Sequence, residues 1–427
     1  MTGEKKKGKS RTLSRRSFLK RSSALAGAPL LAGLMAPAVS RAANGGTLRY
    51  LAAAEDDSVY MQNVIVPQFE KETGIKVLVD QVEYINLYTK EVLEFRSSTY
   101  DVYQVDQVWA QAYAKSGYLM PLDSEISATT LASFFPNLAK IGNVNGKQWV
   151  VPFSAIPVNF TYRKDLVSAP ATWTDVLDNA KKLTKEASGD QPALWGFPIR
   201  GQAGNPITWT WLPMLWGFGG DAFDANFKPT YNNDAGLQAV DFYKQLYKYS
   251  PPGWLSDAQV SNYMEQGQGV QTTLQMVFDA PMSSPKSSKV ADKIAFSGMP
   301  KQVTQASILG LWNIGISAKT ANKANAVKFV EYLSRTDIAT QMALAGVIGA
   351  TQPAIYKAPG APAYFPVLSE VLTYVRPPPI LPEGNQWFLI TGTALQSALS
   401  GKQTVKEAMD DAANQVQQLL ANAGYYK

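Results

Sequence analysis

The sequence predicts an α/β protein built from two lobes. Between residues 47 and 106, short runs rich in β-branched and aromatic residues alternate with amphipathic helical segments. Such alternation is typical of a parallel sheet with helices on its faces. The chain has 427 residues, 46% of them apolar, which is more than one hydrophobic core usually organises. We therefore expect two packed lobes.

Residues 1–42 are typical of an export signal. The heptapeptide SRRSFLK at 14–20 follows a basic stretch and precedes a modestly apolar run over 24–39. It resembles the twin-arginine signal peptides, which are read by the translocation machinery for folded proteins. The apolar run is broken by glycine and proline and is shorter than the roughly 20 residues that span a bilayer. We expect cleavage near Ala42 and a soluble periplasmic protein, without a lipid anchor because no cysteine follows.

The signal segment accounts for the apparent basicity of the chain. The whole sequence has 40 basic and 34 acidic residues, with a formal net charge of +6. Residues 1–42 contain ten of the basic residues and one acid, so the remainder has 30 basic and 33 acidic residues and a net charge of about −3. Because this balance offers no basic surface, we expect no nucleic-acid partner.

The chain contains no cysteine and no histidine. Disulfides, thiolate ligands and His-ligated zinc are therefore excluded, as are Ser-His-Asp and Cys-His catalysis. An enzyme built on this sequence would have only carboxylate, lysine, tyrosine or serine chemistry. We expect neither a cofactor nor a metal.

The elements after the signal follow one another regularly. Residues 47–53 predict a strand, 58–74 an amphipathic helix that stops at its final glycine, and 75–83 a second strand. A helical stretch over 87–96 leads to a third strand at 100–106. This order predicts parallel pairing of the three strands.

Acidic and aromatic residues follow each predicted strand. Glu55 and Asp56 come after the first strand, Tyr84 after the second, and Asp106 and Trp109 after the third. Because ligands of open α/β sheets bind outside the carboxyl ends of the strands, these residues are ligand-binding candidates. An acid in such a position can alternatively cap the helix that follows it.

Six blocks of sequence, in order, carry a resemblance to a known family. They are DVYQVDQVWAQAYAKSGYLMPLD (101–123), NGKQWVVPFSAIPVNFTYRKDLV (145–167), PATWTDVLDNAKKLT (170–184), WLPMLWGFGGDAFD (211–224), AVKFVEYLS (326–334) and SALSGKQTVKEAMDDAANQVQQLLANAGY (397–425). The chain resembles the extracellular solute-binding proteins of ABC importers, in the carbohydrate-binding group that includes maltose-binding protein.

The resemblance implies a type II periplasmic-binding-protein fold with a hinged cleft. Each lobe is expected to hold a mainly parallel sheet with helices on both faces. Residues 43–154 with 309–352 are expected in the N-terminal lobe, and 155–308 with 353–427 in the C-terminal lobe. A ligand would bind between the lobes, hinge closure would bury it, and a membrane permease would receive it. The resemblance implies a monomeric carrier, not an enzyme.

Aromatic side chains support a carbohydrate ligand, because sugars offer apolar faces for stacking and hydroxyls for hydrogen bonds. The chain has 10 Trp and 20 Tyr. By the resemblance, further ligand-binding candidates facing the cleft are Trp209, Trp216, Asp221, Trp312, Asn313, Trp387 and Asn385. A tryptophan is more often part of a core, and for Trp173 at a helix start we expect a core position.

The sequence departs from the family pattern at two places. In VQTTLQMVFDAPM (270–282), Met282 stands near the usual stacking tryptophan and Asp279 replaces a neutral residue. Before the second crossing between lobes, only Gly310 remains of a common Gly-Gly pair. Asp279 is a further ligand-binding candidate, able to pair with a hydroxyl or with a cation.

Two other ligands and one enzyme activity remain open. Acids beside aromatic walls would also suit a polyamine, whose binding would weaken steeply with salt. Ferric iron would require several tyrosine oxygens, and the adjacent pair Tyr425 and Tyr426 lies at the chain end. A glycosidase would need two carboxylates across the cleaved bond, for which Asp56 and Asp106 are conceivable.

Several residues have purely local interpretations. Thr172 with Asp175, and Thr404 with Glu407, have the spacing of helix-capping boxes. The apolar residues of 326–333 form the stripe of an ordinary buried helix face. These residues are expected to support the fold alone.

Overall fold

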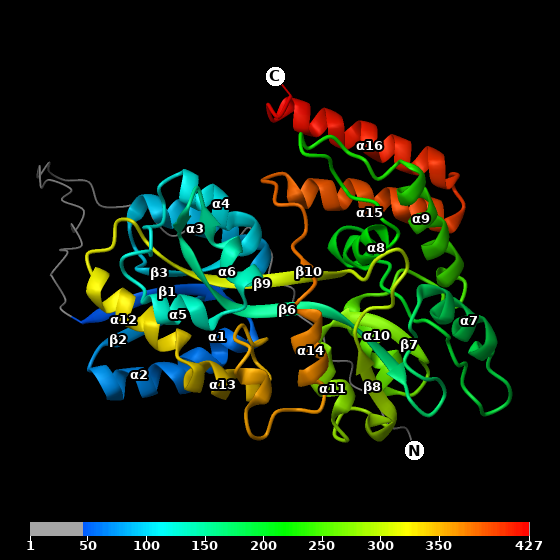
Figure 1. Ribbon diagram of the computed structural model, residues 1–427, viewed down its shortest axis with the longest axis horizontal. Helices are drawn as coiled ribbons and strands as arrows, with labels where there is room; N and C mark the ends of the chain where they lie inside the picture. The colour runs from blue at the N-terminus through cyan, green and yellow to red at the C-terminus, as the bar shows by residue number, and fades with distance from the viewer. Residues whose placement is uncertain (1–45, 427) are drawn as a thin grey trace, which may run out of the picture. The chain divides into compact units, whose positions relative to one another are not determined.

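The computed structural model describes residues 46–426 (Figure 1). The predicted signal segment 1–42, with its cleavage site near Ala42, lies outside the described residues. Among the described residues, no helix combines the length and the apolarity that crossing a membrane requires.

The first elements follow the predicted alternation. Strands β1 (Thr47–Ala53), β2 (Lys76–Val82) and β3 (Val102–Asp106) are confirmed, and β1 pairs in parallel with both of the others. The helix after β1 comprises α1 (Asp56–Tyr60), a π-helical turn (Met61–Ile65) and α2 (Val66–Thr73). Gly74 ends it in the left-handed conformation, with φ 73°. Helix α3 (Tyr84–Ser97) links β2 to β3.

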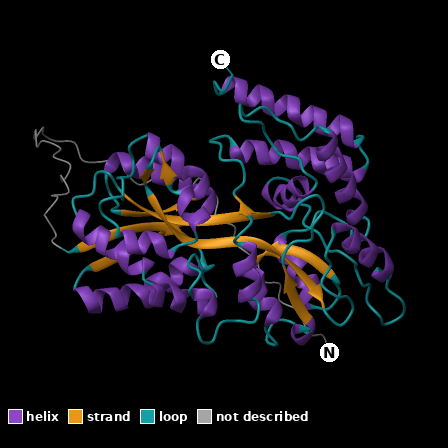
Figure 2. Cartoon of the chain, viewed as in Figure 1, coloured by secondary structure: helices purple, strands orange, loops and turns teal. Residues whose placement is uncertain are grey.

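Two long strands run through both halves of the described chain (Figure 2). Strand β6 (Val150–Arg163) pairs antiparallel with β9 (Ser307–Ile316), from Val150 opposite Gly315 to Pro157 opposite Leu309. The strand order is β2-β1-β3-β9-β6-β7, where β7 spans Gln271–Gln275. The long strands β6 and β9, here called the shared strands, form a ladder that both lobes contain. The carboxyl ends of the first three strands therefore face the middle of this ladder.

The remaining elements cover the two ends of the sheet (Figure 1). Around the first strands lie α4 (Gln107–Lys115), α5 (Ala128–Ser133), α6 (Pro136–Ile141), the hairpin β4 (Asn143–Val144) and β5 (Lys147–Gln148), α12 (Lys323–Ser334), α13 (Thr336–Leu344) and α14 (Phe365–Val371). Around the other end lie α7 (Trp173–Leu183), α8 (Asn205–Gly217), α9 (Asp234–Tyr247), α10 (Asp257–Glu265), α11 (Asp279–Ser283), β8 (Ile294–Ser297), α15 (Gly384–Ser400) and α16 (Val405–Asn422).

Two large hydrophobic cores divide the described chain. The first holds buried side chains from β1 to Ala155 and again from Leu309 to Val375. The second holds buried side chains from Val158 to Ile308 and again from Leu381 through α16. The sequence assigned residues 353–427 to the second lobe, whereas the buried side chains between Ile355 and Val375 pack in the first core. The cause is α14, which packs beside β6.

The second lobe departs from the expected parallel sheet. β7 and β8 both pair antiparallel with β6, and the two-residue strand β10 (Val375–Arg376) pairs in parallel with β9. The reason is the length of β6, which continues without a break from the first lobe into the second. There β7 and β8 run in the opposite direction beside it. The sheet as a whole is mixed.

The local predictions are confirmed. Thr172 and Thr404 each cap a helix through a capping box with the acid three residues later. Trp173 is buried in the second core, and the apolar stripe of α12 is buried in the first. The C-terminal block is split into two helices, because Gly401 ends α15 in the left-handed conformation.

Candidate functional site

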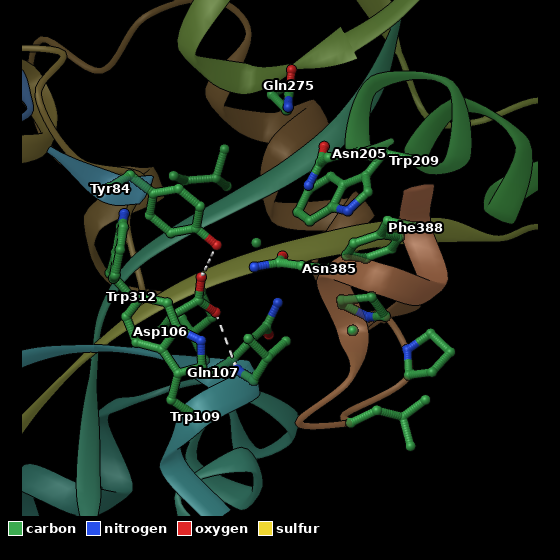
Figure 3. Close-up of a pocket in the computed structure, with 18 of the residues that line it drawn as sticks. Tyr84, Asp106, Gln107, Trp109, Asn205, Trp209, Gln275, Trp312, Asn385 and Phe388 are labelled. Atoms are coloured by element: carbon green, nitrogen blue, oxygen red, sulfur yellow. Dashed lines mark hydrogen bonds between the residues drawn. The ribbon is translucent and has the colours of Figure 1, made fainter. Parts of the chain in front are cut away.

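A cavity of about 200 Å³, here called the main pocket, lies where side chains of both cores face each other (Figure 3). The residues that line it are Glu55, Tyr84, Asp106, Gln107, Val108, Trp109, Ile156, Asn205, Trp209, Gln275, Gly310, Leu311, Trp312, Pro378, Pro379, Leu381, Pro382, Gly384, Asn385 and Phe388. A cavity of this size suits a small ligand.

The first-lobe wall of the main pocket is an aromatic cluster around a carboxylate. Antiparallel register places Trp312 on β9 directly opposite Asp106, the last residue of β3. Tyr84, at the start of α3, stacks on Trp109 of α4 with ring centroids 5.7 Å apart and meets Trp312 edge-on at 5.8 Å. Because the rings pack on one another, the wall is organised before any ligand arrives.

Two carboxylates are held by this cluster. Asp106 accepts hydrogen bonds from the backbone N–H of Val108 at 3.1 Å and from the Tyr84 hydroxyl at 3.0 Å, through different oxygens. Glu55 Oε2 accepts from Trp312 Nε1 at 3.1 Å. Asp106 thus caps α4 and lines the main pocket at once.

The electrostatics of the main pocket disfavour negative charge. Burial raises the pKa of Asp106 to about 6, and burial also raises the pKa of Glu55. Burial and the neighbouring Asp106 raise the pKa of the Tyr84 hydroxyl, which therefore stays protonated. Among residues 46–426, the lining includes no Lys or Arg. An anionic ligand would meet two carboxylates without a compensating cation.

The second-lobe wall carries amides and two further rings. Asn205 and Trp209 lie one turn apart on α8, and Asn385 and Phe388 lie three residues apart at the start of α15. Gln275 ends β7. Figure 3 shows these side chains opposite Tyr84 and Asp106. Primary amides both donate and accept hydrogen bonds, so this wall complements the acceptors of the first.

Three buried polar atoms of the lining lack a partner among the described residues. They are Trp209 Nε1, Gln107 Oε1 and Gln275 Oε1. The other end of the Gln107 amide is fixed, because its Nε2 donates to the carbonyl of Leu309 at 2.6 Å. Leaving such groups unpaired costs roughly 1–3 kcal/mol each. Hydroxyl groups of a ligand would satisfy one donor and two acceptors.

Gly310 of β9 lies under the Trp209 ring at the floor of the main pocket. A Cβ atom at position 310 would lie 3.1 Å from Trp209 Cη2 and 3.5 Å from Ile156 Cβ. We expect Gly310→Ala to displace the ring and to weaken ligand binding about tenfold, since a stacking contact worth about 1 kcal/mol and a hydrogen bond would be misplaced. Titration calorimetry of variant and wild type measures this, and urea unfolding shows whether the fold is retained. Unchanged affinity would show that the ring is not a ligand contact.

Six of the sequence-derived candidates meet at the main pocket. They are Glu55, Tyr84, Asp106, Trp109, Trp209 and Trp312. Asn385, also expected to face the cleft, lines it too. The structure therefore brings together residues that are far apart in the sequence.

Three candidates are buried away from the main pocket. Asp279 is fully buried and accepts a hydrogen bond from Asn159 Nδ2 at 2.7 Å. Asn313 is fully buried and donates to backbone carbonyls. Trp387 is buried in the second core, because it lies two residues from Asn385 and hence on another face of α15. Met282 is likewise buried, in a small third core.

The other candidates lie outside the main pocket. Asp56 is exposed and does not line the main pocket. Trp216 and Asp221 line a different, neighbouring pocket. The carboxylates that share the main pocket are Glu55 and Asp106, not the pair Asp56 and Asp106 that was considered for a glycosidase.

Sequence reasoning missed three amides and one aromatic ring of the site. Asn205 precedes Trp209 by four residues, a spacing that places both on one helix face, so the tryptophan could have identified it. Gln107, Gln275 and Phe388 carry no comparable signal. Over residues 46–426, no three or more Asp or Glu side chains gather closely enough to hold a metal ion.

Comparison with known proteins gives one family and consistent relatives. Residues 52–340 match the family model described as bacterial extracellular solute-binding protein. A probable amino-acid ABC transporter periplasmic-binding protein of Sinorhizobium fredii is 26% identical, over 84% of this chain and 86% of its own length. The mannitol-binding protein of Pseudomonas aeruginosa is 23% identical, over 89% and 94%.

Solved structures agree with these relatives. A solute-binding protein of Agrobacterium vitis with bound D-mannitol superposes with a TM-score of 0.74 at 25% identity, covering 90% of this chain and all of its own. One of Agrobacterium radiobacter in complex with ribitol gives a TM-score of 0.76 at 25% identity, covering 88% and 99%.

Proposed function

Since the chain belongs to the bacterial extracellular solute-binding proteins, we propose that it is the substrate-binding component of an ABC transporter and captures a neutral carbohydrate or polyol in the main pocket. The relatives that were solved with mannitol and ribitol support the ligand class. The proposed role is binding and delivery to a membrane permease, not catalysis.

One observation of this chain carries the proposal. Aromatic rings and hydrogen-bonding side chains converge on one small cavity, where the Trp209 N–H and two glutamine oxygens are buried without partners in the described part of the chain. A sugar or polyol supplies what this lining lacks, because its C–H faces stack on the rings and its hydroxyls both donate and accept. An apolar ligand would leave the polar atoms unpaired.

The charge of the lining separates this proposal from an amino-acid or acid ligand. Glu55 and Asp106 would repel a ligand carboxylate, and the described lining offers no cationic partner for it. We expect D-glucose or a hexitol to raise the melting temperature while D-glucuronate and free amino acids do not. A clear shift with an amino acid would contradict the neutral-ligand assignment and agree with the name of the Sinorhizobium relative.

Closure about the shared strands is the proposed motion. We place the crossings between Ala155 and Val158 on β6, at Ile308 to Leu309 on β9, and at 376–381, where buried side chains pass from one core to the other. Two crossings lie within paired strands, which limits the motion to bending and twisting of the ladder. A ligand that contacts both walls would favour the closed state.

A thermal-shift screen of residues 43–427 tests the proposal. Monosaccharides, polyols, oligosaccharides and polyamines are compared at two salt concentrations. A ligand present at 1,000 times its dissociation constant stabilises the folded protein by about 4 kcal/mol, which is readily detected. A shift with one sugar or polyol family that salt does not change would support the proposal, and no shift with any of them would reject it.

A polyamine is the second candidate ligand, favoured because the described lining around Glu55 and Asp106 has no basic residue. Rings of Tyr84, Trp109 and Trp312 could surround an ammonium group. Its binding would weaken steeply as salt rises, because screening acts on the charge pairs. A salt-sensitive shift with polyamines alone would therefore select this ligand.

The proposed location is the periplasm, after twin-arginine export and cleavage near Ala42. The family is extracellular, and the sequence of residues 1–42 supports that export route. N-terminal sequencing of the exported protein tests the cleavage site, and Arg15→Lys with Arg16→Lys should retain the precursor in the cytoplasm if the twin-arginine pair is read.

A further inference from the structure

A second cavity, here called the side pocket, lies beside the main pocket. It has a volume of about 190 Å³ and is lined by Trp216, Asp221, Phe223, Asp224, Phe227, Arg376, Pro377 and Pro379. Pro379 also lines the main pocket. The two cavities therefore adjoin across one residue of the proline-rich segment, and each is of similar size.

The floor of the side pocket is a fixed polar group on an aromatic base. The Arg376 guanidinium lies 4.6 Å above the centre of the Trp216 ring and donates from Nη2 to Asp221 Oδ2 at 2.6 Å. Asp221 Oδ1 accepts from Trp216 Nε1 at 3.2 Å. A guanidinium has five N–H donors, and among residues 46–426 the Arg376 side chain uses one of them, in the bond to Asp221. Its remaining edge can donate to further acceptors.

Phe227 stands at the rim in a conformation that its side chain does not favour. Its φ is +59°, the left-handed region that is uncommon for a bulky residue, and 38% of the residue is exposed. The Phe227 carbonyl accepts a hydrogen bond from the Tyr426 hydroxyl at 2.7 Å, and its ring meets Tyr425 edge-on. Contacts with the end of the chain thus hold a strained residue with its ring beside the pocket. A backbone turn also holds this conformation, because the Phe227 N–H donates to the Asp224 carbonyl at 3.0 Å and the Asp224 N–H donates to the Lys228 carbonyl at 2.9 Å.

Like the main pocket, the side pocket combines apolar faces with hydrogen-bonding groups. Phe227, Pro377 and Pro379 offer apolar faces, while Arg376 supplies donors and Asp224 a carboxylate. We propose that the side pocket binds a second sugar unit of a ligand whose first unit fills the main pocket, so that the preferred ligand is a disaccharide or a polyol bearing one sugar. This inference rests on the proposed carbohydrate or polyol function.

Matched ligand pairs test this assignment by titration calorimetry of residues 43–427. The pairs are glucose with maltose, sorbitol with maltitol, and mannitol with glucosyl-mannitol, and each pair differs by one glucosyl unit. For the pair that fits the main pocket, we expect the second unit to raise affinity about tenfold, as an added stacking contact and hydrogen bond would.

The Phe227→Gly variant shows whether the gain arises in the side pocket. Glycine suits the left-handed backbone, so removing the ring relieves strain and the fold should be retained. We expect the variant to lose most of the gain from the second unit while its affinity for the one-unit ligand stays within about twofold. Phe227→Tyr, which keeps the ring, should retain the gain, and Leu78→Ala, at an exposed position on β2, should behave as wild type.

The outcomes separate the two proposals. Equal affinity for both members of every pair, or an equal loss for both members in Phe227→Gly, overturns the side-pocket assignment while one-unit binding still supports the carrier function. If no sugar or polyol binds at all, the proposed function itself is rejected and the assignment is rejected with it.

Discussion

The free energy of unfolding should fall as pH rises from about 4 to about 7, by roughly 3 kcal/mol from Asp57 alone. Asp57 is 3% exposed, and its carboxylate accepts hydrogen bonds from the Ser58 N–H and from Gln104 Nε2, each at 2.7 Å. Burial, followed by the charge of Glu55, raises its pKa to about 7. At pH values between its unfolded-state and folded-state pKa, the Asp57 carboxyl is protonated in the folded protein and ionised in the unfolded chain.

The sign follows from this difference in bound protons. Stabilisation by protonated Asp57 is fully present below the unfolded pKa and is lost as pH rises through the folded pKa. Burial also raises the pKa values of Glu91 and Asp279, which act in the same direction. Urea unfolding at pH 5 and pH 8 measures the effect. Equal or greater stability at pH 8 would show that these carboxyls are ionised in the fold at little cost.

The Asp279→Asn variant separates the effect of Asp279 on the pH dependence of stability from the effects of Asp57 and Glu91. Asn159 Nδ2 bonds one oxygen of Asp279, while Asn159 Oδ1 and Asp279 Oδ1 are buried without partners among the described residues. An amide at 279 cannot ionise and can offer a donor to the asparagine oxygen. We expect a gain of about 1–3 kcal/mol at pH 8 and little change at pH 5. A gain of the same size at both pH values would contradict an origin in ionisation.

Asp106→Asn should weaken ligand binding about ten- to hundredfold. A hydrogen bond to a charged group contributes about 1.5–3 kcal/mol, and each 1.4 kcal/mol is a tenfold change in affinity. Asparagine keeps the shape and an oxygen that can cap α4 through the Val108 N–H, so the fold should be retained. Calorimetry with the best ligand of the screen measures the loss.

The pH dependence of binding provides the second measurement on Asp106. Its pKa is about 6, so in the wild type affinity should fall as pH drops below about 6 and the acceptor is protonated. The Asp106→Asn variant should show no such dependence. Asp178→Asn, an exposed acid on α7, is the matched control and should bind as wild type. Unchanged affinity and an unchanged pH profile in Asp106→Asn would remove Asp106 from the site.

The sequence predicts the first lobe better than the second. Strand and helix periods, the glycine that ends α2 and the capping boxes are local signals, and they predict β1, β2 and β3. The strand-end residues Glu55, Tyr84 and Asp106 then line the main pocket. Pairing of β7 and β8 with β6 is set by contacts between distant segments, and no local pattern encodes its direction.

Some site candidates lie away from the main pocket for physical reasons that a single sequence does not reveal. Asp279 meets Asn159, 120 residues earlier, which makes an acid tolerable in a buried position. Trp387 and Asn385 are close in sequence, yet the phase of α15 directs one into the core and the other to the main pocket. Residue type identified the chemistry of this segment, and helix phase decided which residue presents it.

The shared strands also determine when the chain can fold. β3 receives its neighbour β9 from a segment about 200 residues later, as the bond from Asn313 to the Val105 carbonyl, 208 residues apart, illustrates. During synthesis the first lobe therefore cannot complete its sheet until most of the second lobe has been made. Such distant pairing slows folding and leaves strand edges open meanwhile. Cutting the chain between the lobes would accordingly yield two incomplete fragments and no independent domain.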